Sequence, residues 1–207
     1  QQPTISRWQR QMCIRDSHCN FGKNGEYFDE ALDVLTNFKN QGGLRFIGLS
    51  DWSNSRIMKY IKMCDPDVVQ PYRNVMDDGF IKSGLCSYVN KNNLGVCFFS
   101  PIKHGLLTGK YDKPTSFELG DHRSGVKDFA DQNVIDKMKQ NRLLLEKRFT
   151  KHRYPVMRGL VDALFNDAKS GCVLLGQRNV DQVNVASTLG EPMDEKDSAW
   201  VKSLYHH

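Results

Sequence analysis

The feature that most constrains this chain is the alternation of short apolar segments with longer segments that carry one apolar stripe. The apolar segments are residues 45–50, 67–70, 94–99 and 172–176. Helices are expected to begin near Phe28, Asn54, Pro155 and Asn179, and to span about 81–92, 131–149 and 194–205. Strands that are apolar on both faces are typical of parallel sheets covered by helices. The pattern therefore predicts an α/β fold of parallel strands with surrounding helices.

Two architectures satisfy this alternation: an open doubly wound sheet, and part of a (β/α)8 TIM barrel. No Gly-x-Gly-x-x-Gly sequence follows a strand, which weakens the dinucleotide-fingerprint version of the open sheet. In barrels, functional residues gather at the carboxyl ends of the strands, and a phosphate site often follows the last two strands. The most distinctive segments of this chain lie at those places, which favours the barrel.

Composition narrows the class of protein. The chain has 207 residues, a net charge of +5, 39% hydrophobic residues and no apolar stretch of membrane-spanning length. The polar N-terminus does not resemble a secretory signal, and the six cysteines show no disulfide or zinc spacing. We therefore expect a cytoplasmic protein without a metal site or membrane partner.

Polar residues lie at the end of each predicted strand. They are Ser50 and Asp51 at the end of the first, Gln70 at the end of the second, residues within 99–111 at the end of the third and residues within 176–179 at the end of the fourth. Arg178, beside a helix that Asn179 is expected to cap, offers a fork of donors that suits a phosphate monoester, and Gly176 permits close approach of the backbone. Each signal has a structural alternative: a turn at Ser100-Pro101, a cap at Gln70 or a solvated loop charge at Arg178.

Four segments, in order, resemble motifs of the aldo-keto reductase superfamily. They are LRFIGLSDWS, VVQPYRN, FFSPIKHGLLTGKY with the following GDHRS, and VLLGQRNVDQV. The resemblance covers about residue 26 to the end. It implies that 18–207 form the C-terminal half of a (β/α)8 barrel that binds NADP(H).

The resemblance also implies roles for individual residues. Those expected to hold the nicotinamide carboxamide are Ser50, Asp51 and Gln70, although the family usually has Asn in place of Asp51. The residues expected to stack under the nicotinamide or to line the pyrophosphate are Phe99, Ser100, Pro101, Ile102, Lys110 and Arg123. The residues expected around the adenosine 2′-phosphate are Gly176, Arg178 and Gln182. Val185 and Ala186 stand where the family commonly has a Glu-Asn pair that holds adenine.

The catalytic Asp, Tyr and Lys of the family have no counterpart in this chain. His18 is the candidate for the family's carbonyl-orienting histidine, and an exposed structural histidine is the alternative. The sequence before it, 1–17, contains MCIRDS, which resembles a translated sequencing adapter. We therefore expect 1–17 to be a non-native or disordered leader.

The leading hypothesis for function is an NADP(H)-dependent oxidoreductase that reduces small aldehydes or ketones to alcohols, present here as a fragment. The alternatives are a non-catalytic NADP(H)-sensing module, as the channel beta subunits of the superfamily suggest, and an unrelated barrel that binds phosphosugars. The basic run 147–153 is expected to be a solvated helix end and not a nucleic-acid site. The open edges of half a barrel predict self-association.

Overall fold

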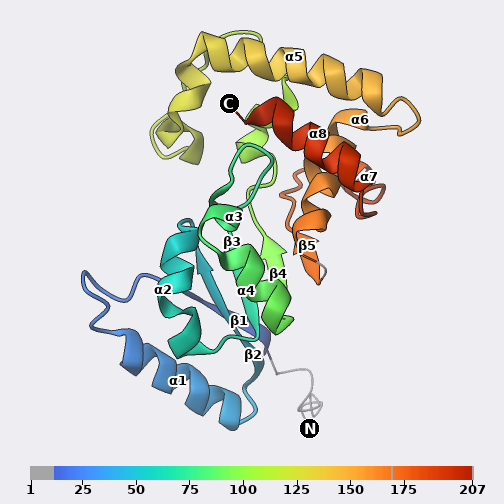
Figure 1. The fold of residues 1–207 in the computed structure, drawn as a ribbon. Coiled ribbons are helices and arrows are strands. Elements are labelled where there is room, and N and C mark those ends of the chain that lie inside the picture. Colours follow the sequence, from blue (N-terminus) through green and yellow to red (C-terminus); the bar gives the residue numbers. More distant parts are fainter. Residues whose placement is uncertain (1–11, 169, 207) are drawn as a thin grey trace, which may run out of the picture. The chain divides into compact units, whose positions relative to one another are not determined.

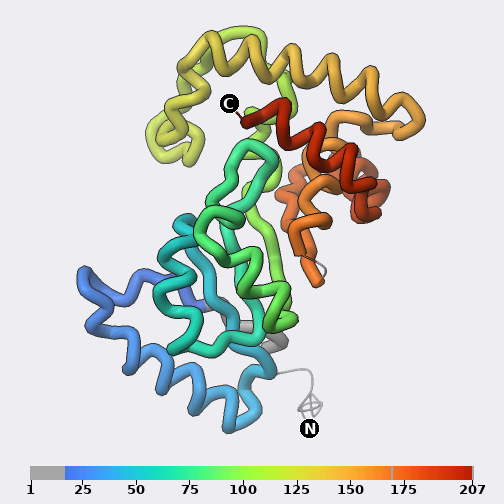
Figure 2. Tube along the Cα trace, viewed as in Figure 1, coloured from blue at the N-terminus to red at the C-terminus, as the bar shows by residue number. Residues whose placement is uncertain are grey.

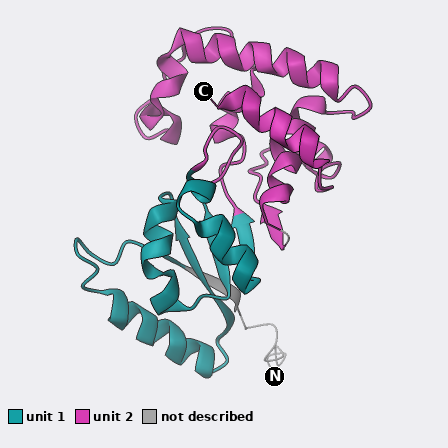
Figure 3. Cartoon of the chain, viewed as in Figure 1, with its two compact units in different colours: residues 1–72, 79–97 teal, residues 73–78, 98–207 magenta. Residues whose placement is uncertain are grey.

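The structure is a computed structural model that describes residues 12–168 and 170–206. The chain divides into two compact units, which Figure 3 shows in different colours. The first unit comprises residues 1–72 and 79–97, and the second comprises residues 73–78 and 98–207.

Parallel strands form the centre of the first unit (Figure 1). They are β1 (Met12–His18), β2 (Leu44–Asp51), β3 (Val68–Pro71) and β4 (Gly95–Phe98). The strand order of the five-stranded sheet is β1-β2-β3-β4-β5, so each strand pairs with the next one along the chain. Sequential pairing of parallel strands is the topology of a (β/α) barrel wall.

Helices connect these strands and cover the sheet. They are α1 (Phe28–Asn40), α2 (Asn54–Cys64), α3 (Gly79–Lys82) and α4 (Leu85–Asn92). Both α1 and α2 pack on β2. The Ser53 hydroxyl caps α2 by accepting a hydrogen bond from the Arg56 amide, as expected of a serine at this position. Ile57 and Ile61 of α2 and Leu49 of β2 are fully buried, and these side chains belong to the core of this unit.

The second unit is mostly helical. After β4 the chain passes through three 3₁₀ turns, η2 (Lys103–Thr108), η3 (His122–Gly125) and η4 (Lys127–Ala130), before it enters α5 (Gln132–Arg148), as Figure 2 traces. An irregular helix follows, made of α6 (Pro155–Met157), η5 (Arg158–Asp162) and η6 (Ala163–Asp167). The remaining elements are β5 (Gly171–Val173), α7 (Val180–Ala186) and α8 (Glu195–Tyr205).

The core of the second unit lies between α5, the irregular helix and α8. Its fully buried side chains include Ile135, Leu145, Leu160, Leu164 and Val201. Four of these residues lie on α5 and the irregular helix at the spacing that predicted an inward stripe. The link to the sheet within this unit is the Leu174 amide, which donates to the Phe98 carbonyl at 2.9 Å.

The α/β fold with parallel strands is confirmed, and the four predicted strands correspond to β2–β5. The sequence pattern did not predict β1. Residues 1–11 of the expected leader lie outside the described residues, whereas Met12–Ser17 belong to β1. The expected helix at 81–92 is divided into α3 and α4 because Gly84 adopts a φ of 82°. No helix in the described part of the chain is long and apolar enough to cross a membrane.

Candidate functional site

The carboxyl edge of the first unit's sheet brings together four residues that the sequence singled out. In the strand register Ser50 of β2 lies opposite His18 of β1 and opposite Gln70 of β3. The Ser50 hydroxyl donates a hydrogen bond to the Gln70 carbonyl at 3.1 Å. Asp51 follows Ser50 as the last residue of β2. Parallel strands therefore place His18, Ser50, Asp51 and Gln70 at one edge, as expected for barrel strand ends.

The carboxylate of Asp51 is engaged by its own neighbours. It is 1% exposed and accepts a hydrogen bond from the Ser53 amide at 2.7 Å. The Arg56 guanidinium lies 3.3 Å from Oδ2, and the His18 Nδ1 lies 3.4 Å from the same oxygen. A buried carboxylate requires such partners because burial disfavours its charge. Within this unit, Asp51 is therefore in a position to hold His18 and the first turn of α2.

Cys19 lies directly after His18 and is buried. Burial, together with the negative charge of Asp51, raises the pKa of the Cys19 thiol to about 12. The thiol is therefore protonated at neutral pH, and a protonated thiol is a poor nucleophile. Cys19 is consistent with a packing role in the core and not with nucleophilic catalysis.

In the second unit the chain leaves β4 through a turn of unusual backbone conformation. Ser100, Lys103 and His104 have φ values of 58°, 45° and 56°, in the left-handed region that non-glycine residues seldom adopt. The Ser100 carbonyl accepts hydrogen bonds from the Lys103 amide at 3.1 Å and from Asn74 Nδ2 at 3.4 Å. We call residues 99–105 the Ser100 turn. It contains the predicted pyrophosphate residues Ser100, Pro101 and Ile102.

Lys110 lies close to this turn. A Cβ placed on Gly105, which has a φ of 91°, would lie 3.3 Å from the Lys110 ammonium. Glycine at 105 is therefore favoured for two reasons: it tolerates the left-handed backbone, and it leaves room for the Lys110 side chain. Lys110 also lies over the Tyr111 ring, with its ammonium 5.2 Å from the ring centroid.

Arg123 lies on η3 and forms an ion pair with Asp121. Its Nη2 lies 2.5 Å from Asp121 Oδ2, its Nε lies 3.0 Å from Oδ1, and its guanidinium stacks over Phe117 at 4.1 Å. Hydrogen bonds from the Arg123 side chain and amide hold the pKa of Asp121 well below its usual range, and the charge of Arg178 contributes to the same shift. The charge of Arg178 therefore reaches Asp121, the partner of Arg123 on η3.

The last predicted segment joins β5 to α7. Gln182 Oε1 accepts a hydrogen bond from the Arg178 amide at 2.6 Å, and Asn179 caps α7 by accepting from the Gln182 amide at 2.9 Å. Gly176, Arg178 and Gln182 are all exposed. A Cβ placed on Gly176 would meet nothing within 4 Å, so this glycine is not required by any described neighbour.

The donor set of the second unit suits a phosphorylated dinucleotide. Lys110, Arg123 and Arg178 are the cations of this set, and guanidinium groups bind phosphate oxygens in a bidentate manner. Asp121 is the carboxylate among them and pairs with Arg123, whereas Lys110 and Arg178 are exposed. The sequence reasoning missed Asp121, and it also missed Arg73 and Asn74, which lie in the VVQPYRN segment that drew attention only for its Gln.

The fold of this chain resembles that of several solved structures. The glycerol dehydrogenase AKR11B4 from Gluconobacter oxydans superposes with a TM-score of 0.77 at 22% identity, covering 94% of this chain and 58% of that one. The aldo-keto reductase AKR11C1 from Bacillus halodurans superposes with a TM-score of 0.67 at 17% identity, covering 95% of this chain and 63% of that one. At these identities the likeness shows the fold.

Curated relatives with similar sequences are reductases. The L-glyceraldehyde 3-phosphate reductase of Escherichia coli K12 is 24% identical over 162 residues, which are 75% of this chain and 47% of that protein. The NADH-specific methylglyoxal reductase of the same organism is 27% identical over 114 residues, 54% of this chain and 34% of that protein. The chain thus spans about half the length of its first curated relative. A model of the aldo/keto reductase family matches residues 11–205, so the chain belongs to the aldo/keto reductase family.

Proposed function

We propose that this chain is the NADP(H)-binding C-terminal half of a reductase that converts small aldehydes or ketones to alcohols. The observation that carries the proposal is that Arg178 and Gln182 follow β5 and that the charge of Arg178 reaches Asp121, the partner of Arg123 on η3, in a chain of this family. An exposed guanidinium group suits a terminal phosphate monoester such as the adenosine 2′-phosphate. The curated relatives include an NADH-specific and an NADP(+) reductase, so our choice between the two dinucleotides rests on these residues.

The residues of this chain would bind and orient the reactants. NADPH, when bound, supplies the hydride that reduces the carbonyl. Ser50 and Gln70 offer a hydroxyl and an amide at the sheet edge for the nicotinamide carboxamide. His18 offers an imidazole for the substrate carbonyl, and Asp51, 3.4 Å from its Nδ1, supports that ring. Tuned proton donation, which the family assigns to a Tyr assisted by a Lys and an Asp, falls to residues outside this chain.

The proposal is tested by titrating the chain with NADP⁺ and NAD⁺ and repeating the titration with Arg178→Ala. A charge-assisted hydrogen bond contributes about 1.5–3 kcal/mol, so the variant should lose about 10- to 150-fold of the preference for NADP⁺. Arg153→Ala is the matched control, because Arg153 is an exposed arginine of the same unit that stacks on Tyr154. Isothermal titration calorimetry measures both affinities.

An unchanged ratio of NADP⁺ to NAD⁺ affinity in Arg178→Ala would refute the assignment of the 2′-phosphate site. Oxidation of NADPH with 4-nitrobenzaldehyde is the second measurement. Cofactor binding without turnover by this chain agrees with a half that lacks the proton donor. The same result from a version that carries the family's Asp, Tyr and Lys would favour the non-catalytic sensing module instead.

Self-association is the remaining proposal on partners. Among the described residues β1 pairs only with β2, and it stands at the end of the strand order. Large apolar side chains nearby in the same unit are exposed, among them Val34 of α1 at 63% and Phe46 of β2 at 42%. An unpaired strand edge beside exposed apolar groups favours contact with another chain.

A further inference from the structure

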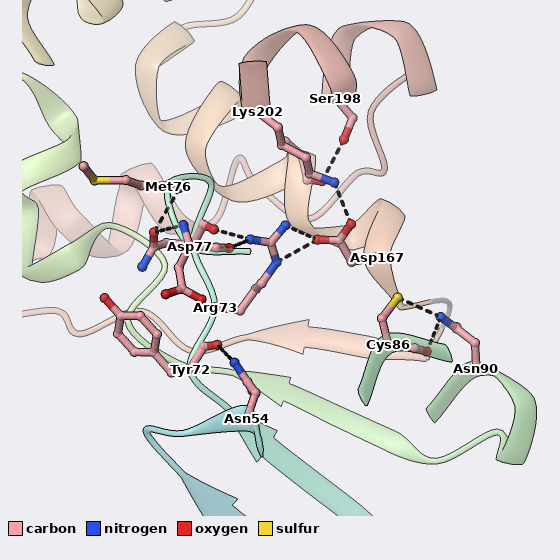
Figure 4. Close-up of polar contacts among 12 residues, drawn as sticks. Asn54, Tyr72, Arg73, Met76, Asp77, Cys86, Asn90, Asp167, Ser198 and Lys202 are labelled. Atoms are coloured by element: carbon pink, nitrogen blue, oxygen red, sulfur yellow. Dashed lines mark hydrogen bonds and ion pairs between the residues drawn. The ribbon is translucent and has the colours of Figure 1, made fainter. Parts of the chain in front are cut away.

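Arg73 is the largest buried cationic side chain of the second unit, and the roles assigned so far do not use it. It is 1% exposed. Its Nε donates to Asp167 Oδ2 at 2.9 Å, its Nη2 lies 2.8 Å from the same oxygen, and its Nη1 donates to the Asn74 and Asp77 carbonyls (Figure 4). Both sides of the guanidinium are therefore used: one binds a carboxylate, and the other binds the backbone of its own segment.

Asp167 connects Arg73 to α8. It is 8% exposed at the end of η6, and its second oxygen accepts a hydrogen bond from the Lys202 ammonium at 2.6 Å. The Ser198 hydroxyl, one turn earlier on α8, donates to the Ala163 carbonyl of η6 at 2.9 Å. We call Arg73, Asp167 and Lys202 the Arg73 cluster. Through it, α8 and η6 hold the segment 73–78, which is otherwise an irregular connection.

The same segment holds the Ser100 turn. The Arg73 amide donates to the Phe99 carbonyl at 3.1 Å, and Asn74 Nδ2 donates to the Ser100 carbonyl at 3.4 Å. Asn74 is fully buried, and its Oδ1 accepts from the Met76 and Asp77 amides at 3.0 and 3.1 Å. The side chain of Asn74 is thus fixed at both ends, so a displacement of the segment displaces the carbonyls of Phe99 and Ser100.

A buried ion pair gives little net stability when compared with apolar residues of the same volume, because its desolvation offsets the attraction. What such a pair supplies is a defined geometry. The left-handed backbone of Ser100 requires a defined geometry around it, because a non-glycine residue in this region is strained and persists only where its neighbours fix it. The Arg73 cluster is the rigid structure to which these neighbours are attached.

We propose that Arg73 is a positioning residue for the cofactor: through Asp167 and Lys202 it fixes segment 73–78, and through that segment it sets the shape of the Ser100 turn. The inference rests on the proposed function, in which that turn holds the pyrophosphate. Arg73 itself contacts no ligand in this scheme. Its loss should weaken the part of the affinity that comes from the pyrophosphate and leave the adenosine 2′-phosphate end intact.

The test compares two ligands by isothermal titration calorimetry on the 207-residue chain. NADP⁺ reaches both sites, whereas adenosine 2′-monophosphate carries the 2′-phosphate and lacks both the pyrophosphate and the nicotinamide half. Arg73→Lys keeps the charge but loses the fork that joins Asp167 to two carbonyls. We expect its affinity for NADP⁺ to fall about tenfold, the equivalent of one hydrogen bond to a charged group, with its affinity for adenosine 2′-monophosphate unchanged within about twofold.

Arg158→Lys is the matched control. Arg158 also pairs with a buried carboxylate of the same unit, Asp162 at 2.5 Å, and it donates a hydrogen bond to the Glu191 carbonyl. This variant should bind both ligands like the original chain. If Arg73→Lys does not fold, Asn74→Ala provides the answer, because it removes the donor to Ser100 and leaves the ion pair in place. It should show the same selective loss.

If Arg73→Lys or Asn74→Ala lowers the affinity for both ligands equally, the inference is overturned, because such a result indicates a general structural role. Unchanged binding of NADP⁺ by a folded variant would overturn it as well. Failure of the original chain to bind either ligand contradicts the proposed function and removes the inference with it. Binding of adenosine 2′-monophosphate with no additional affinity from the pyrophosphate and nicotinamide parts of NADP⁺ contradicts the inference alone.

Discussion

Two regions of the molecule are built around a buried carboxylate bound by an arginine, and they differ in how far apart their partners lie in the chain. At the sheet edge of the first unit, Asp51 binds the amide of Ser53 and the guanidinium of Arg56, two and five residues away. In the second unit, Asp167 binds Arg73, which lies 94 residues earlier. The first arrangement shapes one strand end, whereas the second joins segments that the sequence keeps far apart.

The two carboxylates also differ in the exposure of their partners. The Arg56 side chain is 52% exposed, so water can solvate its charge if the carboxylate is lost. The Arg73 side chain is 1% exposed and has no such alternative. The same chemical pair is therefore expected to have unequal importance for folding, and matched isosteric substitutions can measure the difference.

The largest effect is expected for Asp167→Asn. The variant leaves the charges of Arg73 and Lys202 without their carboxylate, and removal of one partner from a buried ion pair costs about 3–5 kcal/mol. The free energy of unfolding, measured with urea by circular dichroism, should fall by that amount. A loss below about 1 kcal/mol, the value typical of exposed ion pairs, would show that the cluster is solvated and would erase the contrast with Asp51.

A smaller effect is expected for Asp51→Asn. The amide oxygen of asparagine still accepts from the Ser53 amide, and the half-exposed Arg56 regains water, so the loss should be about 1 kcal/mol. The same urea measurement applies. If the free energy of unfolding falls as much as in Asp167→Asn, the sheet edge depends on the charge of Asp51 as strongly as the second unit depends on the charge of Asp167.

The smallest effect is a change in the pH dependence of stability. It is expected to differ between Asp67 of the first unit and Asp162 of the second, because their pKa values are shifted in opposite directions. Burial opposes ionisation of Asp67, but hydrogen bonds from the Lys39 ammonium and the Ile47 amide prevail and lower its pKa from the ordinary 3.8. Burial raises the pKa of Asp162 despite its bonds to the Gly190 amide and the Arg158 guanidinium.

The two shifts predict opposite pH profiles. A lowered pKa stabilises the folded state above the unfolded value and loses this contribution as the pH falls, so Asp67→Asn should cost about 0.2–1 kcal/mol at neutral pH and less in acid. A raised pKa stabilises the folded state below the unfolded value and loses this contribution as the pH rises. The cost of Asp162→Asn should therefore grow on acidification. Urea unfolding on both sides of pH 3.8 checks the signs, and parallel profiles would contradict them.

The contrast between Asp51 and Asp167 also explains what the sequence could predict. The Asp-Trp-Ser-Asn-Ser-Arg run after β2 contains its own cap and counter-charge, and the alternation of apolar segments was sufficient for the fold class, for β2–β4 and for α5. The family match supports the barrel assignment and excludes the unrelated phosphate-binding barrel. The predicted roles of the cofactor-binding residues and of His18 remain predictions.

The contacts that escaped prediction are those made over long sequence separations. Nothing in VVQPYRN indicates that its arginine is buried, because its partners lie in a helix end and a C-terminal helix with no motif of their own. The strand β1 escaped for a different reason: its polar sequence lacks the apolar alternation that identifies a strand, and only pairing with β2 defines it. Both the burial of Arg73 and the formation of β1 therefore depend on contacts with residues that lie elsewhere in the sequence.

The left-handed residues of the Ser100 turn have one more consequence. A chain segment that settles into a shape only when a ligand arrives gives up conformational entropy at that moment, and the binding constant is lower for it. Here Ser100, Lys103 and His104 already adopt their uncommon conformations. The ordering is complete when the polypeptide folds, so a ligand that matches this turn meets a preorganised receptor and keeps more of the free energy of its contacts.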